Sequence, residues 1–276
     1  MRILFLGDVV GKTGCKSLIE NLPDQIKKNK IDFVVVNGEN ADDTGVGLTK
    51  TICENFFKSG VNVITTGNHV WDQRDIIGRI DADNKLLRPV NFPLGTPGRG
   101  ANIYDTISGC RILVINVMCR LFMDPLDDPF AALERLLSEN TLGGSVDAII
   151  IDVHGEASSE KMAIGHAFDG RASLIVGTHT HVPTADLQIL DGGTAYQTDA
   201  GMCGDYDSVI GMRKAPAIER FRRKIPGERL SPASGPADLC GVFIETDDKT
   251  GLANYVAPLR IGNRLFSTWP DRYEDR

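Results

Sequence analysis

The sequence lacks the features that mark disulfide-rich and membrane-spanning proteins. Its six cysteines are scattered and form no C-x-x-C pair, so we interpret most of them as small core residues of a reduced compartment. No apolar stretch approaches the ~20 residues that cross a membrane. The apolar run at residues 3–6 is too short for a signal peptide. We therefore expect a cytoplasmic protein with no membrane partner.

Positive charge is also in short supply. Lys and Arg number 30 against 37 Asp and Glu, which gives a net charge of −7 and a pI near 5.3. This balance argues against non-specific binding to nucleic acid or to anionic membranes, although it leaves room for a local positive site. The hydrophobic content of 42% and the charged content of 24% are ordinary for a globular protein. A chain of 276 residues is long enough to bury a large core.

In the first 80 residues, short apolar runs alternate with segments of helical periodicity. Strands are predicted at 3–6, 33–36 and 61–64, and helices at about 15–28, 49–58 and 74–80. Buried strands that alternate with helices are typical of a parallel sheet in an α/β fold.

Further along, hairpins and single strands replace this alternation. The predicted hairpins pair 101–107 with 111–117, 186–190 with 194–198, and 239–245 with 252–258; strands are predicted at 147–153 and 172–176, and helices at 130–138 and 158–168. The polar and basic stretch 205–236 is interpreted as a solvated surface excursion, with a lid or a subunit contact as the alternative. No repeat or linker divides the chain, so we expect one domain over 1–276.

Histidine is scarce, yet two of the five histidines, His179 and His181, follow the predicted strand 172–176 directly. In an extended backbone, residues i and i+2 point to the same side. The pair therefore predicts a metal site, and the alternative is a pair of polar loop residues.

Polar side chains of the kinds that bind metals follow five of the predicted strands. They are Asp8, Glu39, Asn40, Asn68, His69, His154, His179 and His181. Taken singly, such a residue is more often a turn or helix-cap residue. In open α/β sheets, however, ligands bind at the carboxyl ends of the strands, so these side chains are expected to converge on one crevice. Together they favour a metal site.

Three of these stretches match a known pattern. Thr66-Gly67-Asn68-His69, then His154, then Gly177-Thr178-His179-Thr180-His181 resemble the motifs of the calcineurin-like metallophosphoesterase superfamily. The sequence departs from the superfamily pattern in two places. Asp8-Val9-Val10 lacks the histidine of the Asp-x-His motif, and Asn37-Gly38-Glu39-Asn40 stands in place of the Gly-Asp-x-x-Asp motif. These departures are similar to the bacterial YmdB-like branch, and the resemblance covers essentially the whole chain. It implies an α/β sandwich of mixed sheets flanked by helices, with the metal site at the C-terminal strand ends.

The resemblance also implies a centre of two metal ions. One metal would be held by Asp8, Glu39, Asn40 and His181, and the other by Glu39, Asn68, His154 and His179, with Glu39 bridging. Carboxylate, amide and imidazole ligands without thiolate suit Fe, Mn, Zn or Co, of which Fe or Mn is favoured. Since only two carboxylates face two dications, the centre keeps about two positive charges and attracts phosphate.

The implied reaction is phosphodiester hydrolysis, with 2′,3′-cyclic nucleotides as the leading substrates. A hydroxide bridging the metals would attack phosphorus, and His69, oriented by Asp72 or another acceptor, would protonate the leaving alkoxide. The alternatives are a phosphomonoesterase or nucleotidase on the same centre, or a slow-turnover metal-dependent regulatory binding protein. We expect a small phosphodiester or nucleotide as the partner, no stable nucleic-acid binding, and homo-oligomerisation as an open option.

Overall fold

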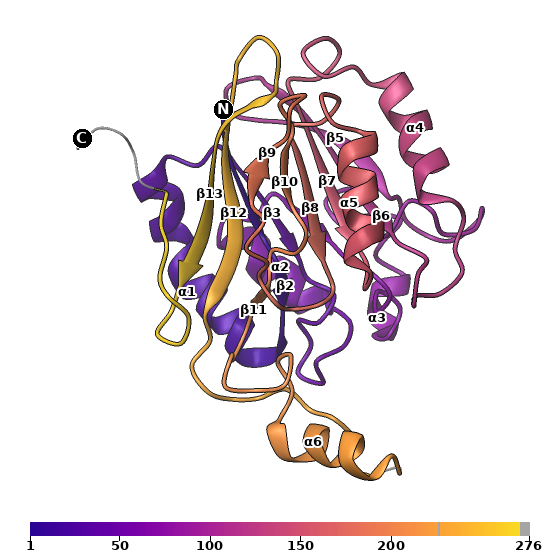
Figure 1. Ribbon diagram of the computed structural model, residues 1–276, viewed down its shortest axis with the longest axis vertical. Helices are drawn as coiled ribbons and strands as arrows, with labels where there is room; N and C mark the ends of the chain where they lie inside the picture. The colour runs from indigo at the N-terminus through magenta and orange to yellow at the C-terminus, as the bar shows by residue number, and fades with distance from the viewer. Residues whose placement is uncertain (226, 271–276) are drawn as a thin grey trace.

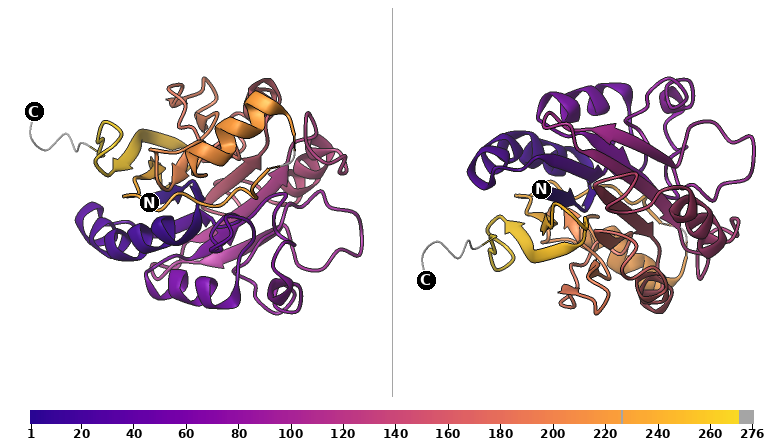
Figure 2. Two further views of the ribbon diagram at one scale, coloured as in Figure 1. Left: turned by 90° about the horizontal axis from the view of Figure 1, so that it is seen from below. Right: turned by 90° about the horizontal axis from the view of Figure 1, so that it is seen from above.

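The computed structural model describes residues 1–225 and 227–270, and they form two stacked sheets with helices on the outer faces (Figures 1 and 2). The first sheet has five strands in the order β13-β12-β1-β3-β4, the second has six in the order β5-β6-β7-β8-β10-β9, and β11 and β2 form a two-stranded sheet. In chain order the elements are β1 (Arg2–Leu6), β2 (Asp8–Val9), α1 (Gly11–Asn29), β3 (Phe33–Asn37), α2 (Lys50–Lys58), β4 (Val63–Thr65), α3 (Arg74–Ile77), β5 (Ala101–Asp105), β6 (Arg111–Met118), α4 (Pro129–Glu139), β7 (Ala148–His154), α5 (Ser158–Ala167), β8 (Leu174–Thr178), β9 (Gln188–Ile189), β10 (Ala195–Gln197), β11 (Met202–Cys203), α6 (Lys214–Arg223), β12 (Leu239–Thr246) and β13 (Ala253–Ile261).

Alternation along the strands divides the core into three layers. In β1, Ile3 and Phe5 belong to the cluster between the two sheets, whereas Leu4 and Leu6 pack with residues of α1 and α2. The outward residues of β6 and β7 pack in the same way against α4 and α5. Because successive side chains of a strand point to opposite faces, each apolar run contributes to two layers.

In the first sheet, β1, β3 and β4 are parallel, as predicted, and the hairpin of β12 and β13 joins antiparallel to β1. The helix α1 begins at Gly11, earlier than predicted, and continues through Pro23 to Asn29. Apolar periodicity missed its first turn because Gly11, Lys12 and Thr13 are not apolar.

The second sheet has a parallel centre and antiparallel edges. Strands β6, β7, β8 and β10 are parallel, while β5 and β9 pair antiparallel with β6 and β10. The parallel strands of both sheets therefore bring their carboxyl ends to one side of the molecule (Figure 1). The predicted site residues lie at or after the ends of these strands.

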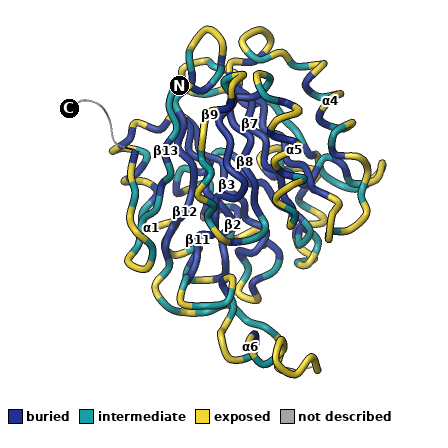
Figure 3. Tube along the Cα trace, in the orientation of Figure 1, coloured by how far each residue is buried: buried dark blue, intermediate teal, exposed yellow. Residues whose placement is uncertain are grey.

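The segment predicted as a surface excursion, 205–236, includes Pro226, which lies outside the described residues. Its helix α6 stands away from the sheets and is largely exposed (Figure 3), whereas Asp205 at its start is buried. In the described part of the chain, no helix is long and apolar enough to cross a membrane.

Candidate metal centre

The structure places all seven predicted metal ligands at the carboxyl-terminal side of the two sheets. Asp8 lies in β2, His154 ends β7, and the others follow β3, β4 and β8. Five of the seven are buried, whereas Asn68 is half-buried and the side chain of His179 is 22% exposed. They form two neighbouring groups.

The first group consists of His154 and three side chains around its ring. His154 Nε2 lies 2.9 Å from Glu39 Oε1, 3.0 Å from Asn68 Oδ1 and 3.2 Å from His179 Nδ1. The ligand atoms of Glu39, His154 and His179 lie within 4.8 Å of one another. One ring nitrogen carries at most one hydrogen and cannot satisfy three acceptors, so these contacts do not form an ordinary hydrogen-bond network.

The second group contains Asp8, Asn40 and His181. His181 Nε2 lies 3.3 Å from Asn40 Oδ1 and 3.9 Å from Asp8 Oδ1. Asn40 Nδ2 donates to the carbonyl of Gly45 at 2.9 Å, which turns the amide oxygen toward the group. The backbone N–H of His179 donates to the Asp8 carboxylate at 3.1 Å to Oδ2, and this bond joins the two groups.

The partner of His154 outside the centre fixes which ring nitrogen faces it. Thr178 Oγ1 donates its single hydrogen to Asp152 Oδ1 at 2.6 Å. The same hydroxyl lies 2.9 Å from His154 Nδ1, so it accepts the hydrogen of Nδ1. In the neutral ring, Nε2 then presents its lone pair to Glu39 and Asn68.

The other two histidines are oriented in the same manner. His181 Nδ1 lies 2.8 Å from the carbonyl oxygen of Ile210, which only accepts hydrogen bonds. His179 Nε2 lies 3.2 Å from the Glu156 carboxylate. With these nitrogens donating outward, His181 Nε2 directs its lone pair toward Asn40 Oδ1, and His179 Nδ1 directs its lone pair toward His154 Nε2. Ligand histidines that donate their other N–H to a carboxylate or carbonyl are typical of metal sites, so the residues present fit a bound cation.

The prediction that His179 and His181 lie in an extended backbone is wrong. The extended conformation ends at Thr178, and His179 and His181 have φ angles of 97° and 66°. These left-handed conformations are uncommon outside glycine and concentrate at functional sites. The two rings reach different groups because the turn redirects them, not because an extended chain points them to one side.

Burial and neighbouring charges shift the pKa values of four of the predicted metal ligands. Burial raises the pKa of Asp8 to about 7, against the opposing effect of His181 and His154. Burial opposes ionisation of Glu39, but the charge and hydrogen bond of His154 outweigh it and lower the pKa of Glu39 to about 2. Burial likewise opposes the charged ring of His154, but Glu39 raises its pKa to about 9. Burial and neighbouring His154 lower the pKa of His179 to about 3. A metal bound here would displace the proton shared by His154 and Glu39.

His69, the predicted general acid, lies beside the centre but outside both groups. Its backbone N–H donates to Glu39 Oε2 at 3.1 Å. Its ring Nδ1 lies 2.7 Å from Asp72 Oδ2, which leaves Nε2 for another partner. The side chain is 33% exposed and lines a cavity.

Sequence reasoning missed the residues that hold the histidine loop. Lys161 Nζ donates to Asp199 Oδ2 and to the carbonyl of Thr178, each at 3.0 Å, and both charged side chains are fully buried. Asp199 Oδ2 also accepts the backbone N–H and the hydroxyl of Thr180, at 3.0 and 2.8 Å. Lys161 lies 38 residues before Asp199 in the sequence, so the sequence gives no signal that the two side chains pair.

The sandwich of mixed sheets and the imidazole, amide and carboxylate donors at its strand ends define a calcineurin-like metallophosphoesterase, as the motifs predicted. The sequence profile of the family described as "YmdB-like protein" matches residues 4–259. The chain belongs to this YmdB-like family.

Relatives of known function or structure resemble the chain over nearly its whole length. A 2′,3′-cyclic-nucleotide 2′-phosphodiesterase of Bacillus subtilis (strain 168) is 48% identical over 263 residues, which cover 95% of this chain and 98% of the relative. A crystal structure of a hypothetical protein from Thermus thermophilus superposes with a TM-score of 0.88 at 40% identity, covering 95% of this chain and 99% of that one. A structure described as a novel phosphatase from Mycoplasma pneumoniae also gives 0.88, at 35% identity over 95% of this chain and 93% of that one.

Proposed function

We propose that the protein is a metal-dependent phosphodiesterase that hydrolyses 2′,3′-cyclic nucleotides. The observation that carries the proposal is the convergence of ring nitrogens and oxygen acceptors around His154 Nε2, where no set of hydrogens satisfies all contacts. The identity of 48% to a phosphodiesterase of this specificity supports the substrate class.

The proposed centre holds two metal ions, Fe or Mn in first place and Zn or Co next. Asp8, Glu39, Asn40 and His181 would hold one, and Glu39, Asn68, His154 and His179 the other. When bound, such ions polarise the phosphoryl oxygens and supply a nucleophile at neutral pH. Thr178, Glu156 and the Ile210 carbonyl keep the ligand nitrogens aimed inward.

His69 is the proposed general acid for the leaving ribose alkoxide. The carboxylate of Asp72 binds Nδ1, so the ring presents Nε2 to the cavity that it lines. The hydrogen bond from the His69 backbone N–H to Glu39 holds His69 next to this proposed metal ligand. A proton delivered from Nε2 to the 2′ or 3′ oxygen completes P–O cleavage.

A phosphomonoesterase on the same centre is the second candidate, and the Mycoplasma pneumoniae relative described as a phosphatase favours it. A slow-turnover regulatory binding protein is the third candidate, since its metal and nucleotide sites would use the same residues.

The test is turnover by protein reconstituted with Mn²⁺ or Fe²⁺ on 2′,3′-cyclic AMP, 5′-AMP and bis-p-nitrophenyl phosphate. We expect hydrolysis of the cyclic nucleotide and loss of both metals in Glu39→Gln. Turnover of the monoester alone would favour the second candidate, and no turnover with any metal would favour the third. Retention of two metals by Glu39→Gln would contradict the bridging role.

Three further expectations remain proposals. We propose one domain over 1–276, of which 226 and 271–276 lie outside the described residues. The proposed location is the cytoplasm, and the six free cysteines agree with a reducing compartment. Homo-oligomerisation stays open.

A further inference from the structure

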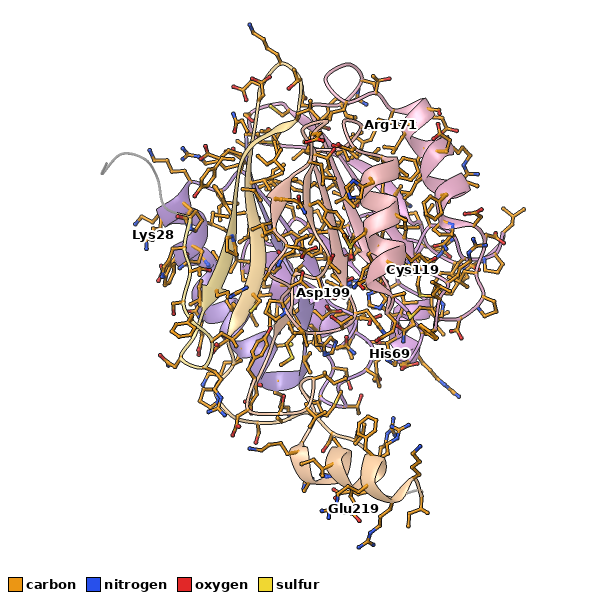
Figure 4. All side chains as sticks on the ribbon, in the orientation of Figure 1. Lys28, His69, Cys119, Arg171, Asp199 and Glu219 are labelled. Atoms are coloured by element: carbon orange, nitrogen blue, oxygen red, sulfur yellow. The ribbon has the colours of Figure 1, made fainter. Side chains whose placement is uncertain are left out.

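A large cavity opens beside the metal centre, and α6 forms its far wall. The cavity has a volume of about 1280 Å³, and its lining includes His69 at the centre and residues of α6 and the segment after it. Figure 4 shows His69 on the side of the molecule where Glu219 of α6 lies. Small-ligand pockets usually measure roughly 300–1,000 Å³, so this cavity exceeds what one nucleotide needs.

Uncompensated positive charge lines the α6 wall. Arg220, Lys224 and Arg229 line the cavity and are exposed, and within 1–225 and 227–270 none of their side chains has an ion pair. The acidic residues of the wall are already paired, since Glu219 binds Arg223 and Glu228 binds Arg213. Among the described residues, the wall therefore offers three free cations in a protein whose net charge is −7, and it attracts anions locally.

The same wall also exposes an aromatic ring. The side chain of Phe221 is 74% exposed, and the neighbouring Ile225 is 57% exposed; both line the cavity. Cations that follow a phosphate backbone, combined with an aromatic ring on which a base stacks, are the usual means of binding single-stranded nucleic acid.

We propose that the α6 wall is a binding subsite for the nucleotides that precede the cyclic phosphate, so that the substrate class includes short single-stranded RNA ending in a 2′,3′-cyclic phosphate. This inference rests on the proposed function. The terminal cyclic phosphate would lie at the metal centre beside His69, and the preceding phosphates would meet Arg220, Lys224 and Arg229. Because the rest of the surface is acidic overall, the protein selects RNA ends and does not coat long RNA.

The first test compares kcat/KM for 2′,3′-cyclic AMP with that for a tetraribonucleotide bearing the same cyclic terminus. We expect the wild-type protein to favour the tetranucleotide. Arg220→Glu should lower the ratio of the two values about tenfold, because it replaces an attracting charge with a repelling one. Arg222→Glu is the matched control: it makes the same charge change two residues away on α6, and Arg222 does not line the cavity.

The second test measures binding without turnover. A 5′-labelled tetraribonucleotide that ends in a 3′-phosphate is titrated with metal-loaded protein at several salt concentrations, and fluorescence anisotropy gives Kd. Three phosphate contacts predict a slope of log K against log salt of about −2, at roughly −0.7 for each contact on a single strand. Arg220→Glu should reduce the slope by about 0.7, and Arg222→Glu should leave it unchanged.

The outcomes separate the two proposals. If neither cyclic substrate is hydrolysed but the salt slope depends on Arg220, the proposed function fails and the subsite stands. If cyclic AMP is hydrolysed and the two variants change the substrate ratio equally, the subsite is overturned. A salt slope near zero would overturn it as well.

Discussion

At the scale of single residues, the proposed catalytic contribution of His69 can be separated from metal binding. It contacts Glu39 through its backbone N–H only, so removing the ring leaves that bond in place. We expect His69→Ala to keep its metal content and to lose roughly 10²–10⁴-fold in turnover, as is usual for a general acid. Metal analysis and kcat on cyclic AMP check this. The control is His166→Ala on the exposed surface of α5; normal turnover in His69→Ala would remove the assignment.

Gly67 gives a second prediction at this scale. A Cβ atom at Gly67 would overlap the ring of His154 and the carboxylate of Glu39. Gly67→Ala should therefore displace both proposed ligands, with overpacking that costs about 1–3 kcal/mol and a fall in metal content. Gly78→Ala is the matched control, because nothing lies within 4 Å of the position that its Cβ would take. Equal metal content in both variants would show that the ligands can move aside without losing the ion.

At the scale of elements, α5 supports the loop after β8. Lys161 of α5 forms a buried ion pair with Asp199, and breaking such a pair by removing one partner typically costs about 3–5 kcal/mol. Lys161→Met should therefore lower the Tm. It should also weaken metal affinity, because Lys161 holds the Thr178–His181 turn through the carbonyl of Thr178. The exposed pair of Lys16 and Glu20, at 3.9 Å, supplies the control: Lys16→Met should change stability by no more than about 1 kcal/mol. Differential scanning calorimetry and metal titration measure both effects. Unchanged metal affinity in Lys161→Met would remove its positioning role.

Strand ends were the part of the site that the sequence could predict. An apolar run followed by Asp8, Glu39 or His154 has a local signature, because burial and the parallel fold fix where such residues go. The partners that aim the rings have no such signature. The partner of His181 is the backbone carbonyl of Ile210, and every residue type has such a carbonyl. The left-handed backbone of His179 depends on the hydrogen bonds of its neighbours. The cavity at α6 likewise depends on how a helix is placed in space, so 205–236 gave only a surface prediction.

At the scale of the whole molecule, the proposed ligands join both sheets, so metal binding should stabilise the fold as a unit. An ion present at a thousandfold excess over its Kd stabilises the native state by about 4 kcal/mol. For a chain of this size that corresponds to a rise in Tm of roughly 8–16 °C. We expect chelation to lower the Tm by such an amount and Mn²⁺ to restore it, with Glu39→Gln insensitive to both. A Tm that is the same with and without chelator would contradict a metal shared between the sheets.

The pairing of β1 has a consequence for how the protein is made. Strand β1 lies between β3 and β12, and Arg2 pairs with Glu245 across nearly the whole chain. A ribosome that adds about 5–20 residues per second needs on the order of 10–50 s to reach β12 after β1 has emerged. During that interval one edge of an apolar strand stays open, and the sandwich that carries the ligands is incomplete. We therefore expect loading of the proposed metal centre to follow synthesis, and we expect the nascent chain to be the form most exposed to aggregation.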